Sequence, residues 1–243
     1  MALPLISIIT VSLNARQALS QTINSVRAQA DTLLEHIIVD GNSSDGTADW
    51  LRAEAFSGVR WISEPDAGIY EAMNKGLNLA QGEWVFFLCA GDELVPGVLE
   101  RIAPLLNPSL DGLIGHVLQA DAGRFYGTFS EAMLISNLIH HQAAFYNRRL
   151  FDQFRYDTRL RSMSDYELNL LLYKQQKNVQ VVDIDVSLCA QQGISAGLLR
   201  SLYESNLIKY RHLGFWQGSW YGGILAWKYL IIYLKKIKKK YKK

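Results

Sequence analysis

The sequence predicts an α/β fold in which a mostly parallel sheet carries helices on both faces, followed by a mixed second half and a C-terminal amphipathic helix. Three observations support this prediction. Apolar, β-branched runs alternate with helical stretches through the first hundred residues, polar turns follow these runs, and the basic residues concentrate at the C-terminal end. Strand–helix repetition at this spacing is typical of βαβ units and a parallel sheet.

The first half of the chain predicts four strands joined by helices. Each strand is a short apolar run of the fully buried type, and we expect them at 5–11, 36–40, 59–63 and 83–89. The first helix, 15–29, repeats Leu19, Ile23 and Val26 on one face. A second helix follows Ser44 or Asp45, either of which is a suitable cap, and a third covers 68–81.

The second half predicts a looser, mixed arrangement. We expect helices at 96–106 and 164–175, and strands near 112–118, 124–129, 143–146 and 179–185. No repeat, low-complexity segment or long linker interrupts the chain before about residue 213. The sequence therefore predicts one compact domain, 1–212, and a separate aromatic and basic segment, 213–243.

The composition excludes several classes of protein. A hydrophobic content of 49% excludes a disordered chain, and two cysteines in 243 residues exclude a disulfide scaffold. Cys89 and Cys189 both lie in apolar runs, so we expect buried thiols in a reducing compartment. The first ten residues lack the basic region and the cleavage site of a signal peptide, so we expect a cytoplasmic location.

The charges divide the chain into an acidic body and a basic end. Ten of the 25 Lys and Arg residues, and none of the 23 acidic residues, lie in 205–243; residues 1–204 therefore carry −8 and the last 39 carry +10. Tryptophans and tyrosines are interspersed with Ile and Leu in 215–234. Lys228 in the middle of this run would cost about 2.5–3.5 kcal/mol in a transmembrane helix.

This segment, 215–243, predicts an interfacial helix on an anionic membrane surface. A helix packed on the body, with its lysine-rich end in solvent, is the alternative that the sequence leaves open. Nucleic acid is not an expected partner, because no recognition motif accompanies the charge.

Polar turns follow the four predicted parallel strands at 12–14, 40–43, 64–68 and 90–93. In open parallel sheets, ligands bind beyond the carboxyl ends of the strands, so these turns would line one crevice. Each turn by itself is equally typical of a structural βα connection. The chain contains no GxxxxGK[ST] phosphate loop, no GxGxxG motif, no HExxH motif and no GxSxG motif, which weighs against dinucleotide, zinc and hydrolase chemistry.

The motif series resembles the family 2 glycosyltransferases with a GT-A fold. The resemblance is carried by ISIITVSLN, IIVDGNSSDGT, SEPDAGIYEAMNKGLNLAQGEW and FFLCAGDEL, and it continues through 140–151, 155–172 and 191–196. It is closest to bacterial enzymes that build exopolysaccharide, capsule or lipopolysaccharide, the colanic-acid fucosyltransferase-like group among them. It covers about residues 3–200.

The resemblance implies a donor-binding site made of Asn14, Asp40, Asp66, Asn74, Lys75 and Gly91. Asp40 would accept a hydrogen bond from the base of the donor, and Asp66 would orient its ribose or diphosphate. A turn or capping role for Asp40 and a solvated surface position for Lys75 are the alternatives.

The resemblance also implies a metal ligand and a catalytic base. The metal motif reads Ala90, Gly91, Asp92, so its first carboxylate is missing and Asp92 alone would hold Mg²⁺ or Mn²⁺ with phosphate oxygens. Asp165 would deprotonate the acceptor hydroxyl. Its alternative role is that of an acidic residue favoured at a helix N-terminus.

Two further elements match the family less closely. His141 and Gln142 correspond to its HQ element and would contact acceptor, diphosphate or metal, although a lone histidine is often structural. Gly193 and Ser195 belong to a loop in which Gln192 replaces the expected first glycine.

The sequence thus predicts an inverting glycosyltransferase on the inner face of the cell membrane. It would move a sugar from a UDP-, GDP- or dTDP-linked donor to a lipid-linked glycan in bacterial surface polysaccharide synthesis. A non-catalytic sugar-nucleotide-binding protein and a membrane-bound assembly subunit are the alternatives.

Overall fold

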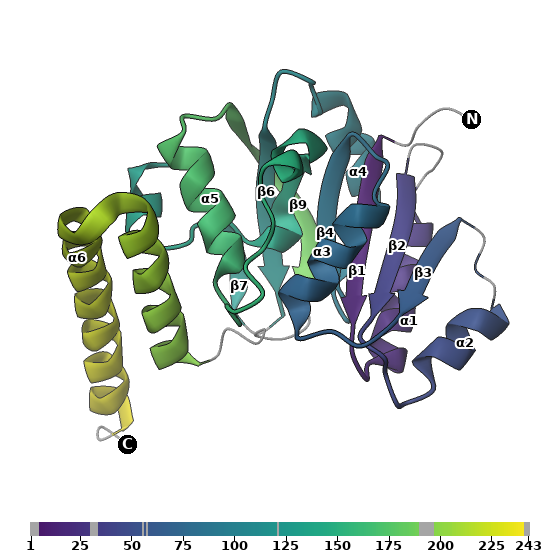
Figure 1. Ribbon diagram of the computed structural model, residues 1–243, viewed down its shortest axis with the longest axis horizontal. Helices are drawn as coiled ribbons and strands as arrows, with labels where there is room; N and C mark the ends of the chain where they lie inside the picture. Colours follow the sequence, from purple (N-terminus) through teal and green to yellow (C-terminus); the bar gives the residue numbers. More distant parts are fainter. Residues whose placement is uncertain are drawn as a thin grey trace.

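A computed structural model describes residues 5–29, 34–54, 56, 58–120, 122–189 and 197–240, and for 232, 233 and 235–240 it describes the backbone only. A nine-stranded sheet forms the centre, with helices on both faces (Figure 1). The strand order is β3-β2-β1-β4-β8-β6-β9-β5, and β7 pairs with β6. The predicted α/β fold with helices on both faces is confirmed.

The first half of the chain builds the parallel part of the sheet. Its strands and helices are β1 (Ile6–Ser12), α1 (Arg16–Arg27), β2 (Leu34–Asp40), α2 (Thr47–Glu54), β3 (Val59–Ser63), α3 (Ile69–Leu79) and β4 (Trp84–Cys89). All four strands are parallel. Asp45, one of the two predicted caps, accepts a hydrogen bond from the backbone N–H of Thr47 at 3.1 Å, at the start of α2.

The second half adds antiparallel pairs. It contains β5 (Glu93–Leu94), α4 (Val98–Ile102), η1 (Ala103–Leu105), β6 (Gly112–Gln119), β7 (Gly123–Tyr126), η2 (Glu131–Leu134), η3 (His141–Ala143), β8 (Ala144–Asn147), η4 (Arg148–Asp152), α5 (Ser164–Lys174) and β9 (Val179–Cys189). The helix expected over 96–106 ends early, because Pro104 lies in the following 3₁₀ turn. Strand β5 has two residues and no local signal that predicts it.

Side chains that alternate along the strands divide the core between the two faces. Ile9 and Val11 of β1 pack with α3 and α5, whereas Ile6 and Ile8 face α1 and α4. A smaller cluster joins α1 and α2 through Leu51. The sheet is thus buried on both faces, as continuous apolar strands require.

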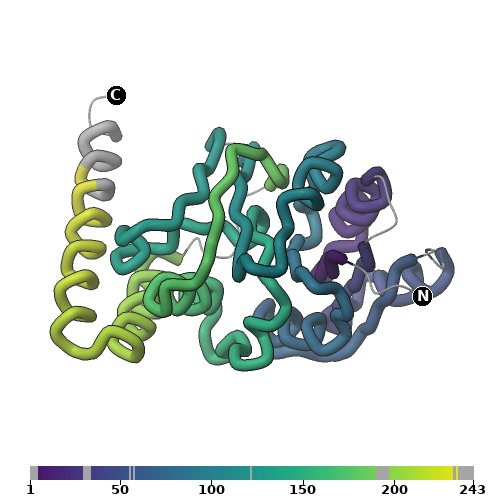
Figure 2. The backbone as a smooth tube through the Cα atoms, turned by 90° about the horizontal axis from the view of Figure 1, so that it is seen from above, coloured from purple at the N-terminus to yellow at the C-terminus, as the bar shows by residue number. Residues whose placement is uncertain are grey.

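Helix α6 (Leu198–Lys240) ends the described chain and is longer than the predicted C-terminal helix. Gly214 interrupts it with φ 78° and ψ 175°, so α6 consists of a first arm, 198–213, and a second arm, 215–240. The second arm folds back along the first at one end of the molecule (Figures 1 and 2). This break lies two residues from the predicted boundary between 212 and 213.

Candidate active site

The carboxyl ends of the parallel strands bring three polar residues into one row. Ser12 of β1 is in register with Asp40 of β2, and Asp40 is in register with Ser63 of β3. The polar turns that follow these strands therefore begin side by side, at the sheet edge where ligands bind in open parallel sheets.

Asp40 is fully buried, and its carboxylate is oriented by hydroxyl and amide donors. It accepts hydrogen bonds from the backbone N–H of Ser43 at 3.0 Å, from the Ser63 hydroxyl at 2.6 Å and from the Ser43 hydroxyl. Asn14 connects the neighbouring loop: its N–H donates to Ser43 Oγ at 2.7 Å, and its Oδ1 accepts from the N–H of Ser44 at 2.8 Å. The first two turns thus form one hydrogen-bonded unit.

Asp66 lies against this unit because position 41 is a glycine. A Cβ atom on Gly41 would lie 2.6 Å from Asp66 Oδ2, which is closer than nonbonded atoms approach. The other carboxylate oxygen of Asp66 accepts from the N–H of Gly68 at 2.9 Å. Two of the predicted donor-binding residues, Asp40 and Asp66, therefore flank the same turn.

Asn74 and Lys75 are engaged within the protein. The Asn74 amide donates to the carbonyl of Tyr156 at 2.8 Å and accepts from its N–H at 3.0 Å. Lys75 Nζ lies 2.9 Å from Glu64 Oε1 and donates to the Pro65 carbonyl at 2.6 Å. These contacts join α3 to the segment at Tyr156 and to the turn after β3, and a direct role of the two side chains toward the donor stays a prediction.

The turn after β4 places Asp92 next to Gln142. Gly91 adopts φ 99°, in the left-handed region that favours glycine, and its N–H donates to Thr22 Oγ1 at 2.9 Å. The Asp92 carboxylate accepts a hydrogen bond from Gln142 Nε2, and both residues are buried. The structure thus unites the predicted metal ligand with one member of the predicted HQ pair, although 50 residues separate them in sequence.

The residues around Asp92 fit a metal ion only if the ligand completes its shell. The described part of the chain contains no group of three His, Cys, Asp or Glu residues that could hold a metal ion. Mg²⁺ and Mn²⁺ take about six oxygen ligands, and Mg²⁺ is commonly held by one or two carboxylates plus substrate phosphates. A single carboxylate at Asp92 suits such a shared site.

Asp165, in the first turn of α5, is buried among two hydrogen-bond donors and a histidine from different parts of the chain. Tyr70 Oη donates to its Oδ1 at 3.1 Å, Asn137 Nδ2 donates to its Oδ2 at 3.0 Å, and His141 Nδ1 lies 3.7 Å from the same Oδ2. His141 in turn contacts Cys89 Sγ through Nε2 at 3.5 Å.

The pKa values of this group favour an ion pair between Asp165 and His141. Burial by itself would raise the pKa of Asp165, but the nearby charge of His141, together with the Tyr70 hydroxyl, outweighs it and lowers that pKa. Burial would likewise lower the pKa of His141, but Asp165 and Cys89 outweigh it and raise that pKa to about 10. Asp165 is therefore ionised at neutral pH, in the state that can accept a proton.

A chain of buried hydrogen bonds orients Asn137 toward Asp165. Tyr146 Oη donates to Asn169 Oδ1 at 2.8 Å, and Asn169 Nδ2 donates to Asn137 Oδ1 at 3.1 Å. Since the ionised carboxylate of Asp165 can only accept, Asn137 must present its NH₂ group to it, and the Asn137 Oδ1 then accepts from the NH₂ group of Asn169. The relay Tyr146–Asn169–Asn137 therefore sets the position of one carboxylate oxygen.

Sequence reasoning missed Tyr70 and Asn137 as neighbours of Asp165, and Asn169 and Cys89 as the residues that contact Asn137 and His141. Tyr70 lies within the motif that carries the resemblance, so the sequence could have indicated it as a site residue. Asn137 lies in a segment with no motif. The predicted residues Gly193 and Ser195 lie outside the described residues.

Comparison with known proteins identifies the family. The model of "Glycosyl transferase family 2" matches residues 7–178. A "PGL/p-HBAD biosynthesis glycosyltransferase" of Mycobacterium bovis (strain BCG / Pasteur 1173P2) is 36% identical over 180 residues, 70% of each chain. The "Putative teichuronic acid biosynthesis glycosyltransferase TuaG" of Bacillus subtilis (strain 168) is 39% identical over 102 residues, 40% of each chain.

Solved structures share the fold at low sequence identity. S. aureus TarS 1-349, in complex with UDP-GlcNAc, superimposes with a TM-score of 0.68 at 17% identity, over 84% of this chain and 64% of that one. The mannosyltransferase PcManGT from Pyrobaculum calidifontis, in complex with GDP-Man and Mn²⁺, gives a TM-score of 0.62 at 17% identity, over 87% and 62%. The chain thus spans less than two thirds of each solved chain, and the likeness shows the GT-A fold that the motifs predicted.

Proposed function

Because this chain belongs to glycosyl transferase family 2, we propose that it transfers a sugar from a nucleotide-diphosphate donor to a hydroxyl of a bacterial cell-surface glycan, with inversion at the anomeric carbon. The observation that carries the proposal is the buried carboxylate of Asp165, which accepts hydrogen bonds from Tyr70 and Asn137 and lies 3.7 Å from His141. The acceptor is lipid-linked, and the enzyme acts at the inner face of the cell membrane.

Asp40 and Asp66 bind the nucleoside and diphosphate end of the donor in this proposal. Both lie on the turns at the carboxyl ends of the parallel strands, and their carboxylates are already oriented by hydrogen bonds within the protein. The likeness to solved structures that hold UDP-GlcNAc or GDP-Man supports a nucleotide-sugar donor. Preformed carboxylates reduce the ordering cost of binding.

Asp92, supported by Gln142, would hold Mg²⁺ or Mn²⁺ together with the donor diphosphate. The bound ion would neutralise charge that develops on the departing diphosphate. The hydrogen bond from Gln142 Nε2 orients the Asp92 carboxylate before the donor arrives.

Asp165 accepts the proton of the acceptor hydroxyl while the oxygen of that hydroxyl attacks the anomeric carbon. The new bond to carbon forms on the face opposite to the departing diphosphate, whose bond to that carbon breaks. A positioned general base contributes about 10²–10⁴-fold. Because the pKa of Asp165 is lowered, its basicity is modest, and its orientation by Tyr70, Asn137 and His141 has the larger share in this step.

Replacing Asp165 with asparagine tests the assignment. UDP-, GDP- and dTDP-sugars are screened with Mn²⁺ for release of the nucleoside diphosphate and for a shift in melting temperature. We expect Asp165→Asn to keep the donor-induced shift and to lose about 10²–10⁴-fold in turnover. Asp152→Asn, the same change at an exposed carboxylate, is the matched control. Full turnover in Asp165→Asn would contradict the role of Asp165 as the base.

A further inference from the structure

The two arms of α6 pack closely through small residues. A Cβ atom on Gly218 would lie 2.8 Å from the ring of Tyr210, and one on Gly222 would lie 2.5 Å from Asn206 Oδ1. Leu225, one turn further, is 5% exposed. The positions 218, 222 and 225 follow the helical repeat, so one face of the second arm is covered by the first arm.

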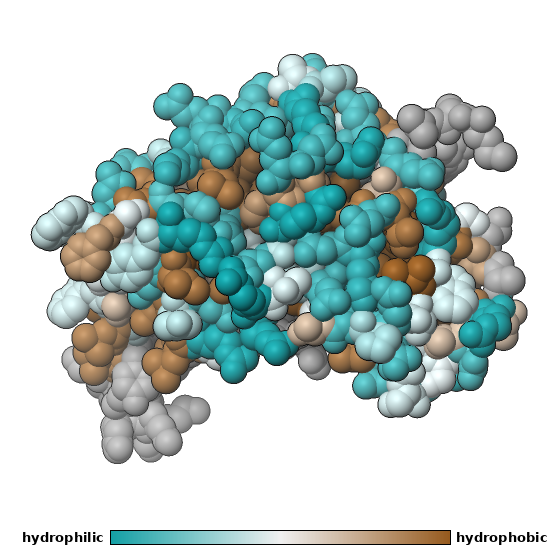
Figure 3. All heavy atoms as spheres, viewed as in Figure 1, coloured by the Kyte–Doolittle hydropathy of each residue, from teal (hydrophilic) through white to brown (hydrophobic). Residues whose placement is uncertain are grey.

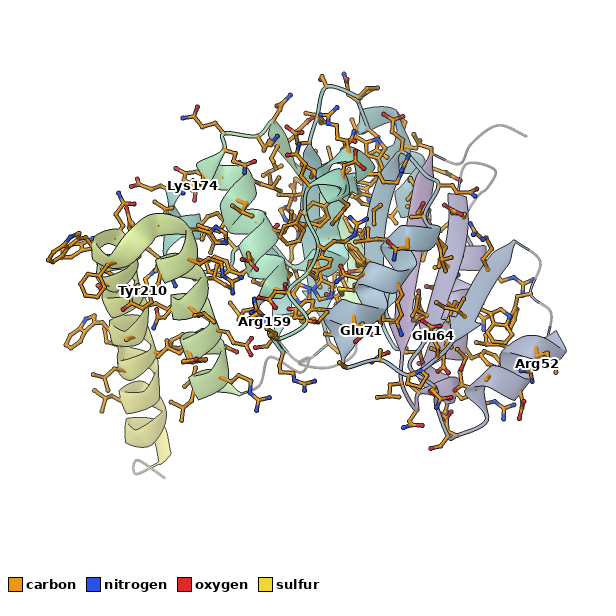
Figure 4. All side chains as sticks on the ribbon, in the orientation of Figure 1. Arg52, Glu64, Glu71, Arg159, Lys174 and Tyr210 are labelled. Carbon is orange, nitrogen blue, oxygen red and sulfur yellow. The ribbon has the colours of Figure 1, made fainter. Side chains whose placement is uncertain are left out.

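The opposite face of the second arm is apolar and exposed. Trp216, Trp220 and Trp227 are 85%, 70% and 63% exposed, and they are spaced by four and seven residues on one side of the helix. Three exposed aliphatic residues extend the same side: Leu230, Ile231 and Leu234. We call these six residues the outward tryptophan face. Helix α6, which carries them, lies at the left edge of the molecule, where Figure 3 shows hydrophobic atoms at the surface and Figure 4 shows side chains that point away from the body. Exposed apolar surface of this extent marks an interaction site.

The first arm fixes this face relative to the active site. Glu204 accepts from the backbone N–H of Arg161 at 3.0 Å and of Ser162 at 2.9 Å, just before α5. Arg211 pairs with Glu167 of α5 at 2.7 Å and with Asp157 at 3.0 Å. The segment that leads into Asp165 and the hairpin of α6 are therefore held together by buried and half-buried polar contacts.

The positive charge at the C-terminal end of the sequence favours an anionic partner for this face. No acidic residue follows Glu204, and seven lysines lie in 235–243. Tryptophan favours the boundary between lipid headgroups and acyl chains, and clustered lysines attract anionic headgroups. Within the described residues no helix is long and apolar enough to cross a membrane. A helix with an apolar face and a basic end, but too polar to span, is suited to lying in the membrane surface.

We propose that the outward tryptophan face of α6 docks on an anionic membrane surface. The second arm runs toward the side of the molecule on which β1, β2 and β3 end (Figure 1). Docking by this face would hold the domain, through the first arm and its contacts with α5, at the surface where a lipid-linked acceptor lies. This inference deepens the peripheral location in the proposed function and rests on it.

Vesicle co-sedimentation of the full chain tests the docking. The probes are vesicles of equimolar phosphatidylglycerol and phosphatidylcholine, and vesicles of phosphatidylcholine alone. We expect the wild-type chain to bind the anionic vesicles at least about tenfold more tightly than the neutral ones. The triple variant Trp216→Ser/Trp220→Ser/Trp227→Ser should weaken anionic binding by at least about tenfold. Tyr126→Ser, at a 60% exposed aromatic on β7, should leave it unchanged.

A second variant and two further measurements distinguish membrane docking from dimerisation and from loss of the proposed transfer activity. Changing the lysines of 235–240 to glutamine should abolish the preference for anionic vesicles without changing the far-UV circular dichroism. Undiminished anionic binding by the triple variant would overturn the proposal. A solution dimer that the triple variant dissociates, without vesicle binding by the wild type, would also overturn it and identify a second copy as the occupant. Release of nucleoside diphosphate, measured without vesicles on the same preparations, reports separately on the proposed transfer.

Discussion

Replacing Asn169 with leucine tests whether the relay Tyr146–Asn169–Asn137 positions Asp165. Asn169 is fully buried in α5, and it accepts from Tyr146 and donates to Asn137. Leucine has nearly the same size but forms neither hydrogen bond. The change therefore leaves the charge of Asp165 and the backbone of α5 intact, and removes only the groups that orient Asn137.

The expected loss in the free energy of unfolding follows from the polar groups that lose their hydrogen-bond partner in Asn169→Leu. The Tyr146 hydroxyl, in a residue that is 1% exposed, loses its partner, which costs about 1–3 kcal/mol. The bond to Asn137 adds about 0.5–1.5 kcal/mol, and burial of the leucine side chain offsets about 1–2 kcal/mol. We expect a net loss of about 1–2 kcal/mol in the free energy of unfolding, which lowers the melting temperature by about 2–8 °C for a chain of this size.

A double-mutant cycle with Tyr146→Phe separates the hydrogen bond from other effects. In the wild type, Tyr146→Phe should cost about 0.5–1.5 kcal/mol. In the Asn169→Leu background it should stabilise the protein, because it removes the hydroxyl that has lost its partner. Urea unfolding of the four proteins measures both values. Equal costs in the two backgrounds would refute the relay as a structural unit.

Kinetics of the same variants test its connection to the active site. Asn169→Leu should lower kcat for release of the nucleoside diphosphate more than it changes the donor KM, because Asp165 acts on the acceptor and not on donor binding. The conservative change Asn169→Gln, at the same site, should restore part of kcat if its amide still reaches Asn137. A variant that loses stability but keeps the wild-type kcat would refute the positioning role.

Three further changes are predicted from single contacts. Gly41→Ala would bring a Cβ atom to within 2.6 Å of Asp66 Oδ2 and so displace this carboxylate. In steady-state kinetics the donor KM should rise by about tenfold, which corresponds to ~1.4 kcal/mol of lost binding energy. An unchanged KM would exclude Asp66 from the donor site. Burial lowers the pKa of His36 from 6.5 to about 4. The unfolded chain then takes up this proton first as pH falls, so stability present above pH 6.5 should decline toward pH 4, and His36→Gln should flatten that decline in urea unfolding at several pH values. Asp92→Asn should raise the Mn²⁺ concentration needed for nucleotide release by about 10–100-fold, and an unaltered Mn²⁺ dependence would exclude a metal at this position.

The first half of the fold was predictable because its signals are local. The apolar runs of β1 to β4 and the helical repeat of α1 and α3 each lie within a dozen residues, and the structure has these elements within a few residues of the predicted bounds. In the second half, the predicted helix 164–175 and the four predicted strands also lie within a few residues of α5, β6, β7, β8 and β9, but β5 was missed. Strand β5 is two residues long and exists only through its antiparallel pairing with β9, for which no pattern within β5 provides a signal.

The candidate site divides in the same way. The sequence by itself determined the family, the row of polar turns after the parallel strands and the identity of Asp40, Asp66, Asp92 and Asp165 as its notable carboxylates, because these features are written in short motifs. The family and the fold are confirmed, and the individual roles stay predictions.

Only the tertiary structure decided which groups surround Asp165 and which face of α6 is exposed. Tyr70, Asn137 and His141 come from positions 95, 28 and 24 residues away from Asp165, and the packing of α5 across the sheet brings them together. Similarly, the sequence predicts an aromatic, basic helix, but the reversal at Gly214 selects the face that the first arm covers. Both outcomes depend on contacts between segments that are distant in sequence. Forming such contacts costs chain entropy, which only the completed core offsets, so local sequence patterns do not predict them.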